Sequence, residues 1–560
     1  MAETQMEIRP VVVLVMLFLA AASGAAPVLD ATDDLGYLSL LDQLDADEAW
    51  SVVDHLASDS FEGRRAGTLT ADLASEYIAG YFASIRLEPA GQTGTYRTKF
   101  AIPLWQLVQL PNLALLDAGG NTLLDFKYRK DFNVIPGSGE GDYSAEVVFA
   151  GYGISANNIG YDDYADISAR AKIVLAIVGA PPSDRFRDGD YEASYVKAEN
   201  AFRHGAAGLI LIDSPADPTP HYVERTRCGC CWRIYEGLTI LGGAVGLAEA
   251  LLKDSGLTLD SVQRTINRDL KPQSFDLRKR LHVSVAVSFT ENPNAYNVLG
   301  FIPGSDPGAS RKTVIIGAHY DHWGKDVDGS IFRGANDDAS GIAVMMEIAR
   351  IFSADVRPKS SVLFTAWSGE EEGFYGSYAY VNHPYFPLGE TIAYLNLDMV
   401  GYGQQLSAHA SEAHKTLRDV VSESAEMLGM PLSVQGYTGG SDQVPFEQKG
   451  VQNVILIYWP DDLYHTPADT ASHVSRRNLI ETARLTALIA LRLSKATVAR
   501  RLLTATEGTA PVSRTSTPKT EYETGTFWKI ITQSTVEIAL GLASAIVIVA
   551  AAFYFQRRKR

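Results

Sequence analysis

The sequence is poor in cysteine and in basic residues, and each shortage excludes a class of protein. Three cysteines among 560 residues are too few for a scaffold held together by disulfides. The 49 lysines and arginines are outnumbered by 66 acidic residues, which gives a formal charge of −17. Nucleic-acid affinity depends on clustered basic residues, so we expect no nucleic-acid partner.

The three cysteines, Cys228, Cys230 and Cys231, lie almost next to one another in the sequence. A metal site would need more ligands nearby, and a structural disulfide usually closes a longer loop. A strained local disulfide and free thiols both stay open, and we assign these residues no function. The sequence also has no Asn-x-Ser/Thr acceptor for N-linked glycans, which favours a bacterial secretory origin.

The remaining composition, with 46% hydrophobic and 21% charged residues, is that of a globular protein. A chain of 560 residues exceeds the roughly 250–300 residues at which a single hydrophobic core stops growing. We therefore expect at least two domains.

Residues 1–25 have the order of a secretory signal peptide. One basic residue, Arg9, precedes an apolar run from Val11 to Ala22, and small residues follow as far as Ala25. The run is too short to span a bilayer comfortably, so we expect cleavage near Ala25. An uncleaved N-terminal helix is the alternative.

Residues 536–556 are predicted to form a transmembrane helix. The run from Ile538 to Phe555 carries no charge, and at about 1.5 Å per residue it reaches roughly 27 Å. The basic residues 557–560 follow, and the positive-inside rule places them in the cytoplasm. Residues 501–535 are rich in threonine and contain proline, as in a stalk. We expect a single-pass membrane protein with its main part outside the cytoplasm, in the periplasm or the extracellular space.

Between these ends, the sequence predicts one domain inserted into another. Residues 26–144 and 291–500 would form the larger domain. From 145 to 290, short apolar strands alternate with turns that contain Gly and Pro, and a short helix is predicted near 197–208. This segment has its own core pattern and enough length for a small, β-rich domain.

The larger domain shows alternating strands and helices after residue 295. Apolar runs rich in β-formers occur at 313–318, 361–366, 392–397 and 451–457. Such alternation predicts an α/β fold, in which a mixed, mostly parallel sheet is sandwiched by helices. Ligands of such sheets bind in the crevice outside the carboxyl ends of the strands.

Imidazole or carboxylate groups follow every one of these predicted strands. In chain order they are His319 and Asp321, then Asp337 and Asp338, then Glu370, Glu371 and Glu372, then Asp398, and finally His465. Singly, each group has a simpler explanation, such as a helix N-cap, a turn or a solvated surface. Jointly they would gather carboxylates in one crevice without a lysine or arginine to balance them, at a cost of several kcal/mol each. A divalent metal would resolve this, and zinc accepts both histidine and carboxylate ligands.

These residues stand in motifs that resemble those of the di-zinc aminopeptidases of metallopeptidase clan MH. The motifs are, in order, AHYDHWG, GANDDASG, WSGEEEGFYGS, LNLDMVG, GGSDQVPF and YHTPADT. The clan also contains glutamate carboxypeptidases and the transferrin receptor. The segment KAENAFRHGAAGLILI resembles a protease-associated (PA) domain, and DSFEGRR resembles the opening segment of bacterial members. The resemblance covers roughly residues 46–495 and implies a zinc-peptidase fold of the phosphorylase/hydrolase type.

The resemblance implies a centre of two zinc ions. Asp337 would bridge the ions. His319 and Asp398 would complete the site of one ion, and Glu371 and His465 would complete the site of the other. Two metals at such a spacing can share a carboxylate and a water and can stabilise a tetrahedral intermediate.

The resemblance also implies the catalytic residues. Glu370 would be the general base that takes a proton from the water and passes it to the leaving amine. The Asp321 carboxylate would orient His319. Tyr464 would donate a hydrogen bond to the oxyanion, a role that the resemblance supports less directly.

Three nearby features complete the expectation. We expect a cis peptide bond between Asp337 and Asp338, as in enzymes that this chain resembles. Glu372 has no predicted role beyond that of a solvated carboxylate. His322 and His383 are interpreted as structural residues.

Together the motifs predict a membrane-anchored zinc exopeptidase that hydrolyses the N-terminal peptide bond of a peptide substrate. Glutamate-carboxypeptidase or dipeptidase specificity at the same site is an alternative, and glutaminyl cyclases share the fold with one zinc. Carboxypeptidase specificity would require basic groups, which the sequence does not place. A non-catalytic, receptor-like member should have lost ligands, and none of the five is missing. The sequence does not indicate an oligomeric state.

Overall fold

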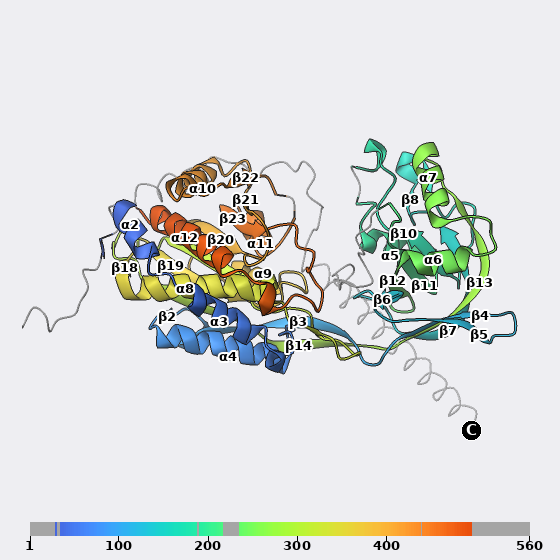
Figure 1. Cartoon of the computed structure of the whole chain (residues 1–560), viewed down its shortest axis with the longest axis horizontal. Coiled ribbons are helices and arrows are strands. Elements are labelled where there is room, and N and C mark those ends of the chain that lie inside the picture. Colours follow the sequence, from blue (N-terminus) through green and yellow to red (C-terminus); the bar gives the residue numbers. More distant parts are fainter. Residues whose placement is uncertain (1–28, 31–33, 188–189, 217–234, 438, 496–560) are drawn as a thin grey trace, which may run out of the picture. The chain divides into compact units, whose positions relative to one another are not determined.

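The strands predicted for the second half of the chain form the central sheet of the computed structural model (Figure 1). The structure describes residues 29–30, 34–187, 190–216, 235–437 and 439–495. The predicted signal peptide, stalk, transmembrane helix and basic tail lie outside these residues, as do the three cysteines. No helix in the described ranges is long and apolar enough to cross a membrane.

The central sheet has nine strands among the described residues, in the order β2-β14-β19-β15-β20-β23-β21-β22, and β3 also pairs with β14. The strands are β2 (Glu88–Pro89), β3 (Arg97–Leu107), β14 (Val287–Ile302), β15 (Thr313–His319), β19 (Ser361–Trp367), β20 (Thr391–Leu397), β21 (Leu406–His409), β22 (Ser433–Gln435) and β23 (Asn453–Tyr458). The four central strands β19, β15, β20 and β23 are parallel. The strands β14 and β21 pair antiparallel on either side of them. The prediction of a mixed sheet with a parallel centre is confirmed.

Helices cover both faces of this sheet, which explains why its central strands are apolar on both sides. Val314 and Ile316 of β15 belong to a core shared with α3 (Ala46–Leu56), α4 (Leu69–Ser84), α8 (Ser340–Asp355), α10 (Lys415–Met427) and α12 (Arg476–Leu493). Ile315 points to the other face, into a core with α9 (Tyr375–Asn382) and α11 (Gln443–Gln448). Strands buried on both faces favour continuous apolar runs.

Side-chain caps fix where three of these helices begin. Asp45 accepts hydrogen bonds from the first-turn N–H groups of α3, and Thr68 caps α4 in the same way. Ser475 accepts from the N–H of Asn478 at the start of α12. Each cap satisfies N–H groups that the helix itself leaves without a partner.

A second sheet of eight strands, in the order β5-β4-β13-β7-β10-β11-β12-β6, includes the segment predicted as an inserted domain. Its strands are β4 (Asn112–Leu116), β5 (Thr122–Phe126), β6 (Phe132–Val134), β7 (Gly141–Ala150), β10 (Ile173–Ile177), β11 (Gly208–Ile212), β12 (Thr239–Gly243) and β13 (Ser274–Val285). The strands β7, β10, β11 and β12 are parallel, and the chain between them includes α5 (Ser194–Arg203). Two further helices, α6 (Val245–Leu252) and α7 (Leu259–Asp269), precede β13. The inserted domain is therefore α/β rather than mainly β.

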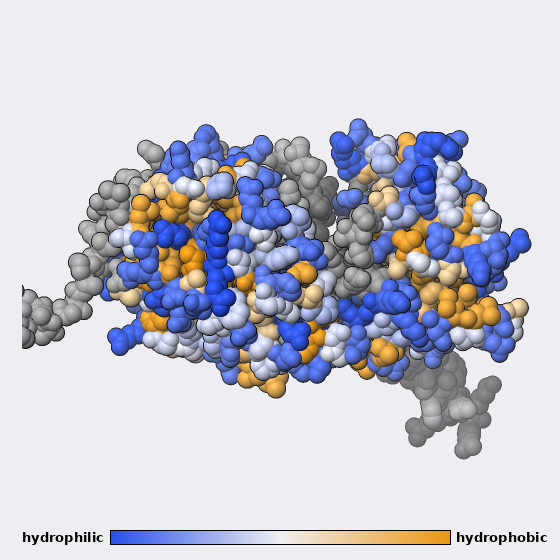
Figure 2. Space-filling view, viewed as in Figure 1, coloured by the Kyte–Doolittle hydropathy of each residue, from blue (hydrophilic) through white to orange (hydrophobic). Residues whose placement is uncertain are grey.

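The second sheet begins before residue 145, the predicted start of the inserted domain. The strands β4, β5 and β6 already belong to the second sheet, which therefore begins at Asn112. Strand β4 pairs with β13, and Ala114 lies opposite His282. A strand whose partner is so distant in sequence leaves no local signal of that pairing. The hydrophobic pattern of residues 112–134 therefore could not show that these residues join the second sheet. Figure 2 shows hydrophobic side chains at the surface of the inserted segment, and Leu123 and Leu124 of the edge strand β5 are 64% and 44% exposed.

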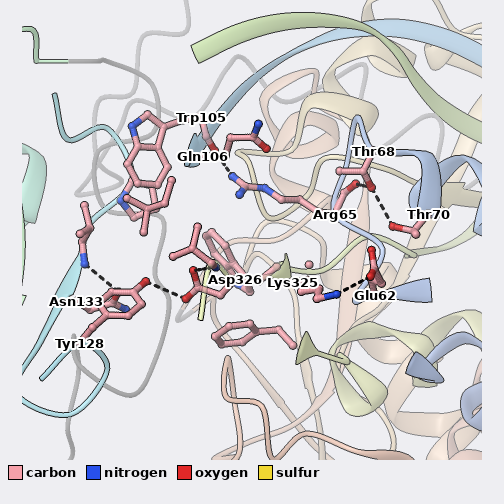
Figure 3. Close-up of a pocket in the computed structure, with 17 residues that line it drawn as sticks. Glu62, Arg65, Thr68, Thr70, Trp105, Gln106, Tyr128, Asn133, Lys325 and Asp326 are labelled. Carbon is pink, nitrogen blue, oxygen red and sulfur yellow. Dashed lines mark hydrogen bonds and ion pairs between the residues drawn. The ribbon is translucent and has the colours of Figure 1, made fainter. Parts of the chain in front are cut away.

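A pocket of about 170 Å³ lies between the inserted segment and the hairpin formed by β16 (Gly324–Lys325) and β17 (Ile331–Phe332) (Figure 3). The Tyr128 hydroxyl and the Arg129 guanidinium both donate hydrogen bonds to Asp326 Oδ2, each with a length of 2.8 Å. The charged groups lining this pocket all have partners: Lys325 pairs with Glu62 at 2.9 Å, and Arg65 pairs with Glu372 at 2.9 Å. These contacts hold the hairpin that directly follows the AHYDHWG segment.

Candidate metal centre

The parallel strands bring all five predicted metal ligands to one edge of the central sheet. His319 ends β15, Asp398 follows β20, and Glu371 follows β19. Asp337 lies just before α8, and His465 lies beyond the end of β23. All five side chains are buried. Because parallel strands end at the same edge, residues far apart in sequence meet there.

The Asp337 carboxylate lies between two imidazoles. Its Oδ1 is 3.1 Å from His319 Nε2, and its Oδ2 is 3.1 Å from His465 Nε2. Each oxygen thus faces a different histidine nitrogen. This is the arrangement expected of a carboxylate that bridges two cations.

The remaining two ligands complete a group on each side of Asp337. Asp398 Oδ1 is 3.7 Å from His319 Nε2, and Glu371 Oε2 is 3.2 Å from His465 Nε2. Donor atoms about 2.0–2.2 Å from a tetrahedral zinc ion lie about 3.3–3.6 Å from one another. The observed separations of 3.1 to 3.7 Å match that spacing, so the donor sets fit two zinc ions.

The neighbouring carboxylates raise the pKa of both imidazoles, His319 and His465. Burial lowers the pKa of His319, but the charge of Glu370 and the hydrogen bonds to Asp337 and Asp398 outweigh it, and the pKa lies well above its usual value. Burial likewise opposes the shift at His465, where Glu371 and Asp337 raise the pKa to about 9. Without a metal, protons would balance the carboxylates.

Asp338 belongs to a different network, although its carboxylate lies within reach of the His319 and Asp398 side chains. Its Oδ1 accepts from the N–H groups of Gly341 (2.9 Å) and Met399 (3.2 Å), and its Oδ2 accepts from the N–H of His319 (3.2 Å). Both oxygens therefore serve the backbone. The peptide bond between Asp337 and Asp338 is cis, as predicted, and the two side chains have separate partners.

The structure gives Asp321 a different position from the one predicted. His319 Nδ1 lies 3.1 Å from the main-chain carbonyl of Asp321, whereas the Asp321 carboxylate is 3.8 Å from that nitrogen. The carboxylate instead accepts the N–H groups of Glu370 (3.3 Å) and Glu371 (3.4 Å). The carbonyl orients the imidazole, and the carboxylate holds the turn that carries the predicted base.

A cavity of about 650 Å³ opens onto this centre. Glu370 and Tyr464 both line it, together with the predicted ligands His319, Asp337, Asp398 and His465. Burial, opposed by the charge of His319, raises the pKa of Glu370 well above its usual range. The Tyr464 ring stacks on His465 with the ring centres 3.6 Å apart, and burial raises its pKa so that the hydroxyl keeps its proton.

Two buried residues that the sequence analysis missed fix the backbone of the centre. Asp469 accepts the N–H groups of Asn336 (2.8 Å) and Asp337 (3.1 Å). Arg64 is fully buried and donates to the carbonyl oxygens of Tyr320 (2.7 Å) and Gly334 (2.8 Å). Both residues stand in motifs noted above, YHTPADT and DSFEGRR, which were the available signals.

Two residues given no site role by the sequence analysis are also buried beside the centre. Glu372 is not solvated, because it is 7% exposed and forms an ion pair with Arg65. His322 is 0% exposed, and its Nδ1 lies 2.7 Å from Glu371 Oε1. Sequence spacing alone did not separate these residues from ordinary surface or core positions.

The central domain has the same pattern as a known peptidase family. Residues 297–490 match Peptidase family M28. This segment belongs to family M28. The M28 segment holds every predicted ligand and the predicted base.

The relatives of the M28 segment include a curated aminopeptidase. The chain is 32% identical over 181 residues to aminopeptidase YwaD of Bacillus subtilis, a match that covers 30% of this chain and 38% of that protein. The match therefore spans less than half the length of this relative.

Two solved structures share the fold. One is an aminopeptidase from Aneurinibacillus sp. strain AM-1, with a TM-score of 0.60 at 23% identity, covering 80% of this chain and 94% of that one. The other is BSAP, a zinc aminopeptidase from Bacillus subtilis, with a TM-score of 0.54 at 23% identity and the same coverage. At this identity the two structures establish the fold.

Proposed function

We propose that the chain is a zinc-dependent aminopeptidase. The observation that carries the proposal is the Asp337 carboxylate, whose two oxygens each lie 3.1 Å from a different imidazole. A carboxylate shared in this way suits a pair of metal ions about 3.5–4 Å apart. The relatives and the neighbouring structures named aminopeptidases support the choice of activity.

Each group of residues in the centre has a separate role in the proposed reaction. Two zinc ions held by the five ligands would polarise the substrate carbonyl and lower the pKa of a water molecule. Glu370, which lines the cavity, would take the proton of the attacking water and pass it to the leaving amine. The Asp321 carboxylate would keep Glu370 in place through its main-chain N–H. The protonated Tyr464 hydroxyl would donate to the oxyanion.

The cavity lining favours the amino end of a peptide over the carboxyl end. No lysine or arginine lines it among the residues that the structure describes. A peptide carboxylate would therefore meet Glu370, Asp337 and Asp398 without a basic partner, whereas a terminal ammonium would be attracted by them. This speaks against the carboxypeptidase alternative.

The floor of the cavity favours an uncharged side chain on the terminal residue. Ile455 and Ile457 of β23 lie opposite His409 and Ser407 of β21, and all four line the cavity. An acidic side chain would lose hydration here and would be repelled by the carboxylates that line the cavity. We therefore infer that terminal residues with neutral side chains are the preferred substrates.

Metal removal combined with a substrate panel tests this function. A strong chelator should abolish hydrolysis of leucyl p-nitroanilide, and added zinc should restore it. The glutamyl substrate should be hydrolysed on the order of 100-fold less efficiently in kcat/KM than the leucyl one. An N-acetylated leucyl substrate should not be cleaved. Activity that survives the chelator, or cleavage of the blocked substrate at the normal rate, would refute the proposal.

We further propose that the protein is anchored in a membrane by residues 536–556, with its catalytic domain outside the cytoplasm. The support is the uncharged run from Ile538 to Phe555 and the basic residues 557–560 after it. Deletion of residues 536–560 should release an active, soluble enzyme. An enzyme that still sediments with membranes would contradict this assignment.

We also propose that the inserted segment is a PA domain. The support is its resemblance at KAENAFRHGAAGLILI, which spans α5 and β11. The described contacts of Tyr128 and Arg129 with Asp326 give this domain a direct connection to the catalytic domain.

A further inference from the structure

His322 occupies a fully buried position between two predicted metal ligands. Its Nδ1 lies 2.7 Å from Glu371 Oε1 and 3.9 Å from Asp337 Oδ2, and the side chain is 0% exposed. Its ring centre is 5.7 Å from that of His465. His322 is thus in direct contact with the metal centre, although it is not one of the five predicted ligands.

Neither partner of this contact has an alternative in the described part of the chain. Within it, His322 Nδ1 and Glu371 Oε1 are buried, and neither atom has a partner in full hydrogen-bond geometry. A buried polar atom without a partner costs about 1–3 kcal/mol. The two atoms lie 2.7 Å apart, a normal length for an N–H···O bond to a carboxylate, so each is the nearest group that can satisfy the other.

The two oxygens of Glu371 face different residues. Oε2 lies 3.2 Å from His465 Nε2, on the side of the metal ligands, while Oε1 faces His322. A carboxylate that rotates freely could present either oxygen, or both, to a metal ion. A donor fixed on Oε1 leaves Oε2 as the oxygen for the ion beside His465.

The His322 ring is itself held in place. Gly334 has φ +58°, and a Cβ at this position would overlap both the His322 ring and the Asp337 carbonyl. Arg64 binds the Gly334 carbonyl oxygen at 2.8 Å. Position 334 leaves no room for a side chain, so the His322 ring packs directly against this backbone.

We propose that His322 is a positioning residue that donates a hydrogen bond from Nδ1 to Glu371 Oε1 and so presents Oε2 to the metal ion. The proposal rests on the zinc centre of the proposed function. The distance favours this role over direct ligation, because 2.7 Å is shorter than the 3.1 to 3.7 Å between the predicted ligands.

Two substitutions at His322 test the role through metal affinity. In His322→Ala the donor is lost, whereas in His322→Asn the side-chain amide keeps an N–H near the place of Nδ1. Zinc binding to the apo-protein would be followed by competition with a chromophoric chelator, and bound metal would be counted by elemental analysis. We expect His322→Ala to bind one of the two zinc ions with an affinity about 10–100-fold lower than that of the wild type. We expect His322→Asn to bind both ions with affinities within a few-fold of the wild type. Wild-type binding by His322→Ala, or equal loss in both variants, would overturn the proposal.

Two controls separate this outcome from failure of the proposed function. His465→Ala removes a predicted ligand, and it should lose zinc and peptidase activity together. If His465→Ala binds both ions normally, the proposed metal centre itself is wrong. His414→Asn changes a histidine that lies 3.5 Å from Glu447 Oε2, outside the centre, and it should leave both affinities unchanged. Thermal melting of each apo-variant would show that the fold is retained.

Discussion

Arg65 Nη2 lies 2.9 Å from Glu372 Oε1, and the two side chains are 16% and 6% exposed. The ion pair ties the segment before α4 to the turn that carries Glu370 and Glu371. Arg65 also donates to the carbonyl oxygen of Trp105, at the end of β3 where the chain approaches the inserted domain. One side chain thus connects three segments that are distant in sequence.

Arg65→Ala should destabilise the protein and lower its activity. The variant leaves the buried Glu372 carboxylate without its partner, which typically costs about 3–5 kcal/mol for a buried pair and less for this partly exposed one. We expect a loss of about 2 kcal/mol in the free energy of unfolding, measured by urea titration, together with a lower kcat. Arg311→Ala is the matched control, because Arg311 is 75% exposed and pairs with Glu390 at 3.3 Å. It should change stability by less than about 1 kcal/mol.

Glu370→Gln should bind both metals and be nearly inactive. Glutamine keeps the size and main chain of Glu370 but cannot accept a proton, so the loss should be at least about 10²–10⁴ in kcat. Elemental analysis would confirm the metal content, and steady-state kinetics would give kcat and KM. Near-normal kcat would remove Glu370 from the role of base.

Asp469→Ala should weaken metal binding although Asp469 is not a predicted ligand. The variant frees the N–H groups of Asn336 and Asp337, which the carboxylate now accepts at 2.8 and 3.1 Å. Loss of a group that orients a ligand typically costs about 10–100-fold in metal affinity. Asp462→Ala, in the same loop but exposed, is the control and should bind zinc normally. Equal affinities in the two variants would argue against the orienting role.

Lys197 should make the stability of the inserted domain rise with pH. Burial lowers its pKa from 10.5 to about 7, against the opposing charge of Asp163, and its Nζ donates to the carbonyl oxygen of Gly179 at 2.7 Å. Between pH 7 and 10.5 the unfolded chain holds a proton that the folded chain lacks, so the free energy of unfolding increases with pH.

Comparison with Lys197→Met isolates this contribution. From pH 8 to 10 the wild type should gain about 2 kcal/mol relative to the variant, measured by urea unfolding at each pH. Burial raises the pKa of the neighbouring Asp163 carboxyl to about 7. Repeating the comparison in an Asp163→Asn background eliminates the contribution of this carboxyl. Parallel pH profiles for lysine and methionine would show that Lys197 keeps its proton in the folded state.

The sequence predicted the central sheet and the five ligands because their signals are local. A buried parallel strand such as β15 is an apolar run, and the group that follows it, His319, necessarily lies at the carboxyl edge. The motif resemblance then named five residues that the structure brings together at this edge. The distances around Asp337 are a product of the folded chain and were beyond the reach of the sequence alone.

Positions fixed by distant partners were not predictable in this way. Glu372 looked solvated because its partner, Arg65, lies far away in the chain. The Asp321 side chain was assigned to His319, yet its oxygens bind the backbone after β19. The early strand β4 had no visible signal, since its partner β13 comes after the rest of the inserted domain.

The chain enters the inserted domain along β3 and leaves it along β14, and these two strands pair antiparallel from Val287 opposite Leu107 onward. At the far end of this pair, the N–H of Val108 binds the carbonyl oxygen of Ala286. Entry and exit therefore stand side by side, at a place where a tight turn could join them. A single recombination event could thus add, remove or exchange the whole inserted segment, while the strands that carry the predicted zinc ligands stay unchanged.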